Sequence, residues 1–241
     1  MSKNSTSIPE KKNGNIAQMF DSIALAYDPL NHIFSFNIDK LWRYRAANVL
    51  RGQPLGKVLD VATGTADFAL IMQKRLQTEH ITGIDISTEM LAVGRQKIER
   101  KGLENKISLH YGNAEALPFD TQAFDVVTVT FGVRHFENLE KGLSEMYRVL
   151  KTGGKVVILE LTIPKNRIVR GFHHLYISYL LPFLGRLFSP NGKVYKYLPK
   201  SVRSIPHWEE FKIIMENCGF NDVKIKSLGF GGAGIYIGLK K

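Results

Sequence analysis

The sequence is poor in cysteine and in long apolar runs. Cys218 is the only cysteine among 241 residues, which excludes an internal disulfide and fits a reducing compartment. No apolar run reaches the roughly 18 residues of a membrane span, and the N-terminus lacks the apolar core of a signal peptide. These absences predict a cytoplasmic protein without a membrane anchor.

Acidic residues are also scarce relative to basic ones. The chain has 33 lysines and arginines against 22 aspartates and glutamates, a net charge of +11. This charge favours contact with a polyanion or an anionic membrane surface, although a surface that simply keeps the protein in solution explains it equally well. The composition, 44% hydrophobic and 23% charged, is otherwise that of a soluble globular protein.

A short apolar run followed by one glycine organises the chain. Residues 58–62 predict a buried strand, Gly64 breaks it, and a helical pattern runs from Phe68 to Leu76. Gly64 lacks a Cβ and lets a ligand approach the backbone, where the N–H groups of the new helix point at it. A second apolar strand ends in Asp85, which is placed to accept the hydroxyls of a ribose.

The loop lacks the three glycines of the NAD fingerprint, Gly-x-Gly-x-x-Gly. It has acidic residues on both sides, Asp60 and Asp67, which repel a diphosphate and suit a ligand with an ammonium and a sulfonium group. The loop and Asp85 thus resemble motif I and the ribose acid of class I methyltransferases, which implies S-adenosylmethionine as the cofactor. An NAD-type oxidoreductase and a non-enzymatic S-adenosylmethionine-binding module remain alternatives.

The rest of the pattern predicts an α/β fold with a Rossmann-like, doubly wound sheet. Further strands are expected at residues 81–84, 106–111, 124–130, 155–161, 222–228 and 235–239. The helix at 138–150 is expected to end in a cap at 151–154. Two consecutive strands at the end predict a seven-stranded sheet with an antiparallel last strand, which is typical of class I methyltransferases.

Helices are expected before the first strand. Residues 1–15 are polar and predict a disordered tail. Helical spacing predicts one helix from Asn15 to about Tyr27, stopped by Pro29. The aromatic stretch 30–37 is expected to be irregular, and a second helix is expected from Ile38 to about Leu50.

The expected single domain spans residues 16–241, with 16–52 as a helical cap and 162–206 as an acceptor-side helical insertion. Within the insertion, residues 175–188 are too apolar for an exposed loop and too short to span a bilayer. They either roof the acceptor pocket and touch the bilayer transiently, or pack as core helices against the sheet or a homodimer partner. Basic residues that suit anionic lipid follow them: Lys193, Lys196, Lys200 and Arg203.

Four further stretches resemble one family closely. They are residues 19–28, 112–119, 131–134 and 197–201, and with the first loop they cover the chain from about Ile16 to its end. They resemble the quinone-biosynthesis C-methyltransferases, which methylate demethylmenaquinol or a related ubiquinol precursor. The resemblance implies C-methylation of demethylmenaquinol to menaquinol, the last step of menaquinone biosynthesis, on a polyprenyl quinol. A ubiquinol precursor or another small phenol or lipid remains the alternative acceptor.

The resemblance also implies cofactor contacts. They fall at Thr65, Asp85, Asn113, Ala114 and Thr130, together with Asp60 and Gly64 of the first loop. The side-chain amide of Asn113 and the backbone N–H of Ala114 are suited to hydrogen-bond the edge of an adenine. An Asx turn explains Asn113 equally well. The chain departs from the family at Ala66, where glycine is usual, and at His135, where asparagine is usual.

A hydroquinone carbon becomes nucleophilic when a ring hydroxyl loses its proton. The candidates for handling this proton are Tyr27, Asp28, Arg134 and His135. For Arg134 there are two interpretations: it stabilises a phenolate, or it forms an ordinary salt bridge. For His135 they are a general base or an exposed capping residue. No metal-ligand spacing is found, so no metal is expected. Residues 131–134 replace the Asn-Pro-Pro-Tyr type motif of base methyltransferases, so nucleic acid is not an expected partner.

Overall fold

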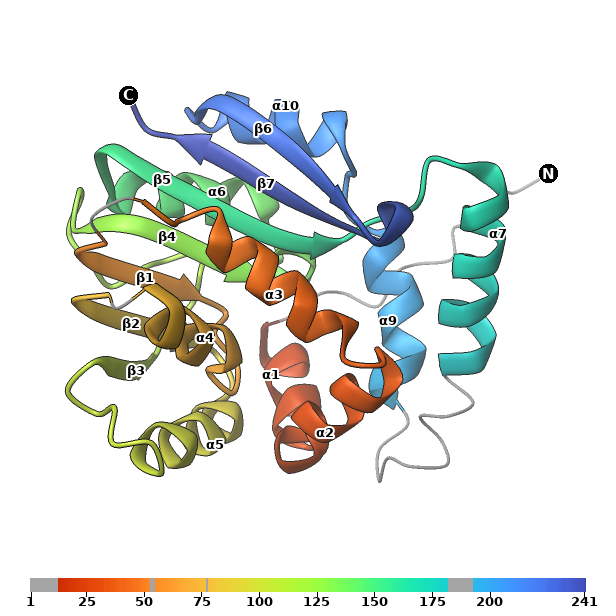
Figure 1. Cartoon of the computed structure of the whole chain (residues 1–241), viewed down its shortest axis with the longest axis horizontal. Helices are drawn as coiled ribbons and strands as arrows, with labels where there is room; N and C mark the ends of the chain where they lie inside the picture. Colours follow the sequence, from red (N-terminus) through yellow and green to blue (C-terminus); the bar gives the residue numbers. More distant parts are fainter. Residues whose placement is uncertain (1–12, 53–54, 77, 182–192) are drawn as a thin grey trace.

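A seven-stranded sheet forms the centre of the molecule (Figure 1). The computed structural model describes residues 13–52, 55–76, 78–181 and 193–241. The strand order is β3-β2-β1-β4-β5-β7-β6. The strands are β1 (Lys57–Val61), β2 (His80–Asp85), β3 (Ile107–Tyr111), β4 (Phe124–Thr130), β5 (Leu150–Leu161), β6 (Asn221–Leu228) and β7 (Ala233–Leu239). The first five pair in parallel and β7 is antiparallel to both neighbours, which confirms the predicted sheet.

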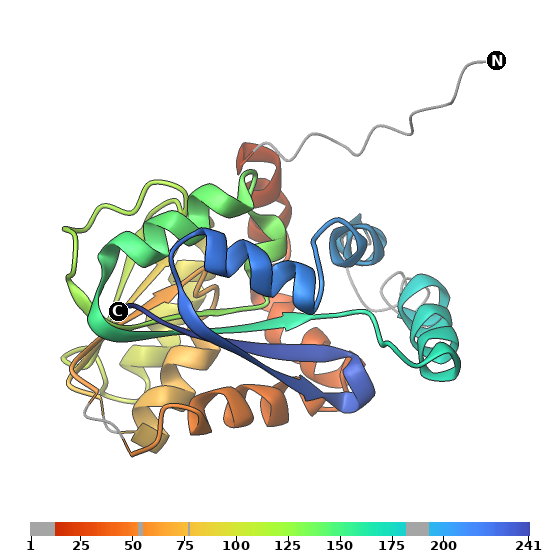
Figure 2. The same cartoon turned by 90° about the horizontal axis from the view of Figure 1, so that it is seen from above.

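Helices cover both faces of the sheet (Figure 2). One face carries α3 (Ile38–Asn48), α4 (Asp67–Leu76) and α5 (Thr88–Glu99); the other carries α6 (Leu139–Val149) and α10 (Glu209–Asn217). An apolar cluster lies on each side, with Phe68 and Leu91 in one and Leu143 and Phe211 in the other. Because both faces are covered, the central strands are mostly apolar, and polar side chains gather mainly where the strands end.

The N-terminal cap differs from the single helix expected over residues 15–27. It forms two helices, α1 (Asn13–Asp21) and α2 (Ala24–Phe34), because the Ser22 hydroxyl bonds the Met19 carbonyl and Ile23 leaves the helical backbone region. Pro29 does not stop the second helix but lies inside it. The proline cannot donate to the carbonyl of Leu25, but Leu25 is strongly exposed, so water reaches that end of the turn.

Two further expectations were wrong. Residues 30–34, expected to be irregular, continue α2, and the left-handed residues Phe36 and Asn37 then turn the chain into α3. Residues 151–154 do not cap α6 but belong to β5. The backbones of Gly153 and Gly154 exchange hydrogen bonds of 2.7 and 3.0 Å with Lys240, so sheet pairing takes the place of the predicted helix cap.

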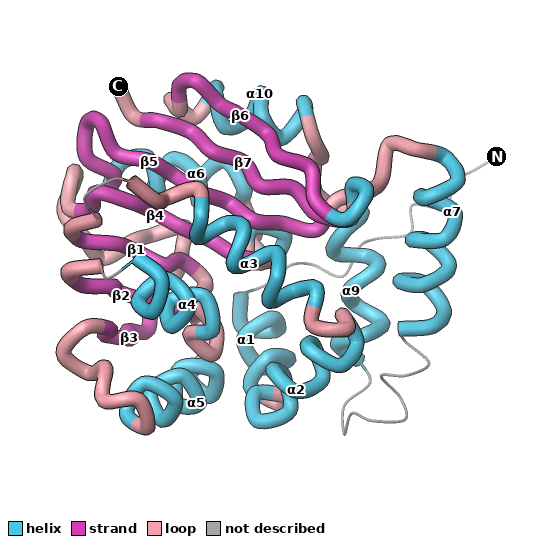
Figure 3. Tube along the Cα trace, viewed as in Figure 1, coloured by secondary structure: helices cyan, strands magenta, loops and turns pink. Residues whose placement is uncertain are grey.

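The insertion stands at the end of the sheet where the parallel strands finish, next to the cap (Figure 3). It contains α7 (Arg167–Leu175), the π-helix η2 (Tyr176–Leu180) and α9 (Lys193–Arg203), while the short helices η1 (Val133–His135) and η3 (Gly229–Gly231) follow β4 and β6. Residues 182–188 of the apolar stretch and residues 1–12 of the predicted tail lie outside the described residues. Within the described part of the chain, no helix combines the length and apolarity needed to cross a membrane.

Candidate active site

The loop after β1 is built from alternating left-handed residues. Ala62, Gly64 and Ala66 have φ of +52°, +55° and +63°. A Cβ on Gly64 would meet nothing within 4 Å, so this residue faces open space. Ala66 occupies a conformation that costs a non-glycine residue about 1–2 kcal/mol. The departure from glycine at this position therefore puts strain into the loop.

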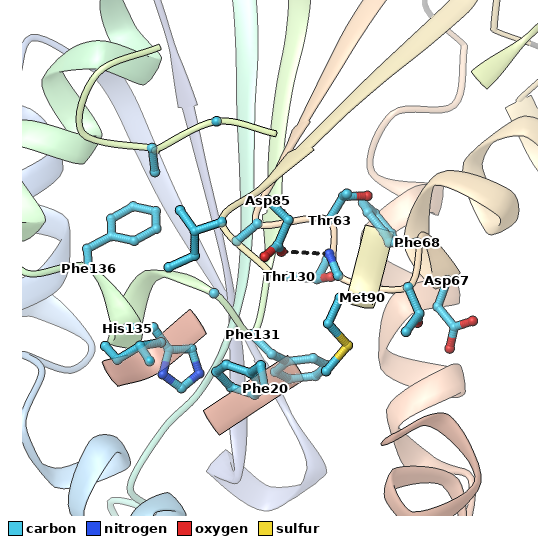
Figure 4. Close-up of a pocket in the computed structure, with 18 of the residues that line it drawn as sticks. Phe20, Thr63, Asp67, Phe68, Asp85, Met90, Thr130, Phe131, His135 and Phe136 are labelled. Carbon is cyan, nitrogen blue, oxygen red and sulfur yellow. Dashed lines mark hydrogen bonds between the residues drawn. The ribbon is translucent and has the colours of Figure 1, made fainter. Parts of the chain in front are cut away.

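Asp85 faces this loop from the end of β2 (Figure 4). Its Oδ2 accepts the Gly64 N–H at 2.8 Å, and its Oδ1 accepts the Ser87 N–H at 2.9 Å. Burial raises the pKa of Asp85, while the bonds from Ser87 and Gly64 oppose that rise. Asp85 and the loop line a cleft of about 830 Å³. The carboxylate is thus fixed in direction and presented to whatever occupies the cleft.

Asp60, the other acid expected to touch the cofactor, lies behind the loop. It is 1% exposed and is not among the residues that line the cleft. Its two oxygens accept the hydroxyls of Thr63 and Thr128, each at 2.7 Å. Burial raises its pKa to about 6, against the effect of these two bonds. This geometry indicates that Asp60 holds the loop in place through the hydroxyl of Thr63.

The other expected cofactor residues line the same cleft. Thr65, Asn113, Ala114 and Thr130 all contribute to its wall. The Asn113 Oδ1 accepts the Glu115 N–H at 2.9 Å, which is the Asx-turn geometry. The turn therefore uses the acceptor oxygen of Asn113 and sets the course of the backbone at Ala114.

The cap is tied to the loop by a chain of polar contacts that we call the cap network. Asp28 accepts the Thr65 hydroxyl at 2.6 Å and pairs with Lys97 at 2.8 Å. Lys97 also pairs with Asp67, whose second oxygen lies 3.4 Å from His32. The hydrogen bond to Asp67 raises the pKa of His32 despite its burial. Asp28, expected to handle a proton, is one member of this network and is not among the residues that line the cleft.

A second cavity lies next to the cleft and shares part of its wall. It has a volume of about 1450 Å³, is open to solvent and is lined mainly by apolar side chains, with residues from α2, α3, η2 and η3. Three residues line both spaces: Tyr27, Arg43 and Phe131. The Arg43 guanidinium lies 5.0 Å above the Phe131 ring. Burial raises the pKa of Tyr27, against the charges of Arg134 and Arg43, so its hydroxyl stays protonated at neutral pH.

Arg134 and His135 are adjacent in the sequence, but they line different cavities. Arg134 lines the second cavity, is 5% exposed and pairs with Glu160 at 2.5 Å. His135 lines the first cleft; its Nδ1 lies 3.2 Å from the Tyr197 hydroxyl and its ring meets Phe20 edge-on. Among the described residues, the Nε atoms of Arg43 and Arg134 are buried without a hydrogen-bond partner. Such donors favour a site that receives an acceptor oxygen.

Several site residues were missed by the sequence analysis. Glu160 carried a signal, because it is a carboxylate that follows directly on the apolar run 156–159. Lys97 looked like a solvent-facing helix residue, and nothing local marks its pairing with Asp28 and Asp67. Trp42 of α3 and Phe230 of η3 both line the second cavity, but they are far apart in the sequence, and only the folded chain brings them together.

The sheet order, the antiparallel last strand and the glycine loop facing an acid define the class: this is the fold of class I S-adenosylmethionine-dependent methyltransferases. The solved structure of a Thermotoga maritima SAM-dependent methyltransferase matches it with a TM-score of 0.66 at 19% identity, covering 93% of this chain and 99% of that one. Residues 6–240 match the ubiE/COQ5 methyltransferase family, and the chain belongs to that family.

Two curated relatives are similar over nearly the whole chain. The demethylmenaquinone methyltransferase of Bacteroides fragilis is 44% identical over 95% of this chain and 94% of its own length. The ubiquinone/menaquinone biosynthesis C-methyltransferase UbiE of Geobacter sulfurreducens is 43% identical over 95% of this chain and 90% of its own length. The predicted family is therefore confirmed.

Proposed function

We propose that this chain methylates a ring carbon of a demethylmenaquinol, with S-adenosylmethionine in the first cleft and the quinol in the second cavity. The observation that carries the proposal is the junction formed by Tyr27, Arg43 and Phe131, the three residues that line both the cleft with its carboxylates and a larger apolar cavity. Two ligands that react with each other need such a junction, because their reacting atoms must approach to about 3 Å. The choice of a quinone ring as the substrate and of carbon as the methylated atom follows from the names of the relatives.

The side chains of the first cleft fit S-adenosylmethionine. Three carboxylates line it, Asp67, Asp85 and Glu115, which suits a cationic ligand and opposes a diphosphate. When bound, S-adenosylmethionine supplies a methyl group on a positively charged sulfur that departs as a neutral thioether. Asp85 accepts the ribose hydroxyls, and the backbone around Gly64 leaves room for the ligand.

The acceptor reaction releases one proton overall. The ring hydroxyl loses its proton as the adjacent carbon forms its bond to the methyl group, that carbon then loses its own hydrogen as a proton to restore the aromatic ring, and the ring oxygen takes up a proton again to give the methylated quinol. Arg134 stabilises the developing phenolate through its unpartnered Nε, while Glu160 holds the guanidinium in place. Tyr27, whose pKa is raised by burial although the charges of Arg134 and Arg43 oppose that rise, is the proposed proton relay.

His135 and Asp28 have supporting roles in this account. His135 lines the cleft and is held in place by the Tyr197 hydroxyl and by the Phe20 ring of the cap. Asp28 positions the cap over the loop and does not touch the quinol. The cap, residues 16–52, and the insertion, residues 162–206, are the acceptor-side elements of one domain. The apolar second cavity takes the start of the polyprenyl tail, and the protein works at the cytoplasmic face of the membrane that holds the quinol.

The test is a direct assay. The purified protein is incubated under reducing conditions with demethylmenaquinol and S-adenosylmethionine that carries a deuterated methyl group. We expect mass spectrometry to find the labelled methyl on the naphthoquinol ring. A ubiquinol precursor, assayed in parallel, measures the preference between the two ring systems. Label on an oxygen, or on neither quinol, would contradict the proposal.

A further inference from the structure

One side of α7 is apolar and open to solvent. Ile168, Phe172, Leu175 and Tyr179 follow one another at spacings of four, three and four residues along α7 and η2, so they share one side of the helix. Their side chains are 73%, 70%, 57% and 65% exposed. We call these four residues the α7 stripe. A continuous uncovered stripe of this kind marks a contact surface, whereas single exposed apolar residues do not.

The other side of the same helical segment faces the second cavity. His173, Tyr176 and Ile177 line that cavity. Two exposed aromatic residues, Phe36 and Phe230, line it from other elements, and both have a positive φ, of 52° and 54°. Holding phenylalanine in that conformation is unfavourable, and such strain gathers at ligand-binding sites. The cavity therefore reaches the surface close to the helical segment that carries the α7 stripe. Figure 1 shows α7 at the outer edge of the molecule.

The charge around the stripe is of one sign. Residues 161–208 contain no aspartate or glutamate. Five basic residues in this range are described and exposed: Lys165, Arg167, Arg170, Lys200 and Arg203. Two copies of this chain that met through the stripe would bring like charges together, whereas a surface of anionic lipid would attract them. An apolar stripe flanked by lysine and arginine is the pattern of helices that lie in a bilayer interface.

We propose that the α7 stripe docks the protein on an anionic lipid bilayer and holds the mouth of the second cavity against it. This inference rests on the proposed function, because a polyprenyl quinol must pass from the bilayer into that cavity. The stripe enters the interface between lipid head groups and acyl chains, and the basic residues contact the anionic head groups. The quinol ring then moves into the cavity while its tail stays in an apolar environment.

Flotation with vesicles tests the docking. We expect the wild-type protein to float with vesicles that contain phosphatidylglycerol at low salt, and less so at high salt or with phosphatidylcholine alone. The double variant Phe172→Ser/Leu175→Ser should reduce the bound-to-free ratio about tenfold or more, since two large apolar side chains no longer enter the interface. The matched control is Ile213→Ser on α10, whose side chain is 54% exposed away from the insertion. It should bind as the wild type does.

A second pair of variants tests the charge. Arg167→Gln/Arg170→Gln should weaken binding, whereas Arg100→Gln/Lys101→Gln, at exposed positions beyond α5, should not. Equal binding by the stripe variant and the wild type would overturn the proposal. So would a wild-type protein that stays unbound at low salt. Loss of self-association in the stripe variant, with vesicle binding unchanged, would make the stripe a contact between copies.

Activity separates this proposal from the proposed function. Without vesicles, the stripe variant should methylate a short-tailed demethylnaphthoquinol as fast as the wild type, because Phe172 and Leu175 line neither cavity. In vesicles, it should be slower on a long-tailed quinol. If the wild type methylates the short-tailed quinol but does not bind vesicles, only the docking proposal fails. If it binds vesicles but methylates no quinol, only the proposed function fails.

Discussion

The hydroxyl of Thr65 donates a 2.6 Å hydrogen bond to Asp28, a residue 37 positions earlier in the chain. Thr65 belongs to the loop that forms the cofactor cleft, and Asp28 belongs to the helix that covers it. The same carboxylate pairs with Lys97 of α5. The cap is thus fastened directly to the cofactor loop, and a ligand that orders the loop also orders the cap.

Loss of the Asp28 charge should loosen this attachment. Asp28→Asn weakens the contacts to Lys97 and Thr65 and should lower the free energy of unfolding by about 1–2 kcal/mol. Affinity for S-adenosylmethionine should fall as well. The matched control is Asp222→Asn, which breaks an exposed pair with Lys241 and should cost only about 0.3 kcal/mol. Urea titration and calorimetry measure both effects, and equal losses in the two variants would contradict the role of the cap network.

His32 should make the stability of the cap depend on pH. Its pKa is raised by the hydrogen bond to Asp67 and, against burial, by the charges of Asp39 and Asp67. The folded chain therefore favours protonated His32. This stabilisation is complete below the ordinary pKa of about 6.5 and is lost as the pH rises through the raised value.

Thermal unfolding across that pH range measures the effect. His32→Gln should remove the fall in melting temperature on the alkaline side, whereas His110→Gln, at an exposed position of β3, should keep it. An unchanged pH profile in His32→Gln would assign the dependence to another group.

Asp85 should carry much of the cofactor affinity. Its carboxylate is fixed by two backbone N–H groups and presents charged acceptors to the cleft. Asp85→Ala should weaken binding of S-adenosylmethionine by about 1.5–3 kcal/mol, the usual worth of a hydrogen bond to a charged group. The exposed Asp120→Ala serves as the control. Unchanged affinity in a folded Asp85→Ala protein, measured by calorimetry, would remove this assignment.

The parts of the fold that depend on local patterns were predictable. The strand, Gly64 and the following helix are contiguous, and Asp85 follows at the end of the next apolar strand. Parallel strands place these ends at one edge, so the cleft follows from the order of the elements. The continuation of α2 through Pro29 was not predictable, because Asp28 is held in place by Thr65 and Lys97, which are remote in sequence.

The acceptor side was less predictable for the same reason. Arg134 could be named from its motif, but its partner Glu160 lies on another strand. Asp60 looked like a ligand contact because it stands just before the loop, yet its carboxylate accepts the hydroxyl of Thr128 on β4. The second cavity is made by the cap, the insertion and η3 together, and only their packing reveals that Tyr27 lines both cavities.

Arg134 should affect turnover far more than cofactor affinity. Arg134→Ala removes a phenolate contact but also leaves Glu160 buried without its partner, which costs about 3–5 kcal/mol of folding stability. The double variant Arg134→Gln/Glu160→Gln avoids the unpaired charge. We expect it to fold, to bind S-adenosylmethionine almost normally and to lose most of its turnover. Equal losses of turnover and of cofactor affinity would make the Arg134–Glu160 pair a structural element.

The central claim is that the two ligands meet where the cleft joins the apolar cavity. A crystal structure with S-adenosylhomocysteine and a short-tailed demethylmenaquinone tests it most directly. We predict the ribose against Asp85, the quinone ring against Arg134, and the sulfur facing a ring carbon beside Tyr27 and Phe131. A quinone bound outside the second cavity, or a ring separated from the sulfur by the side chains of the junction, would contradict the account.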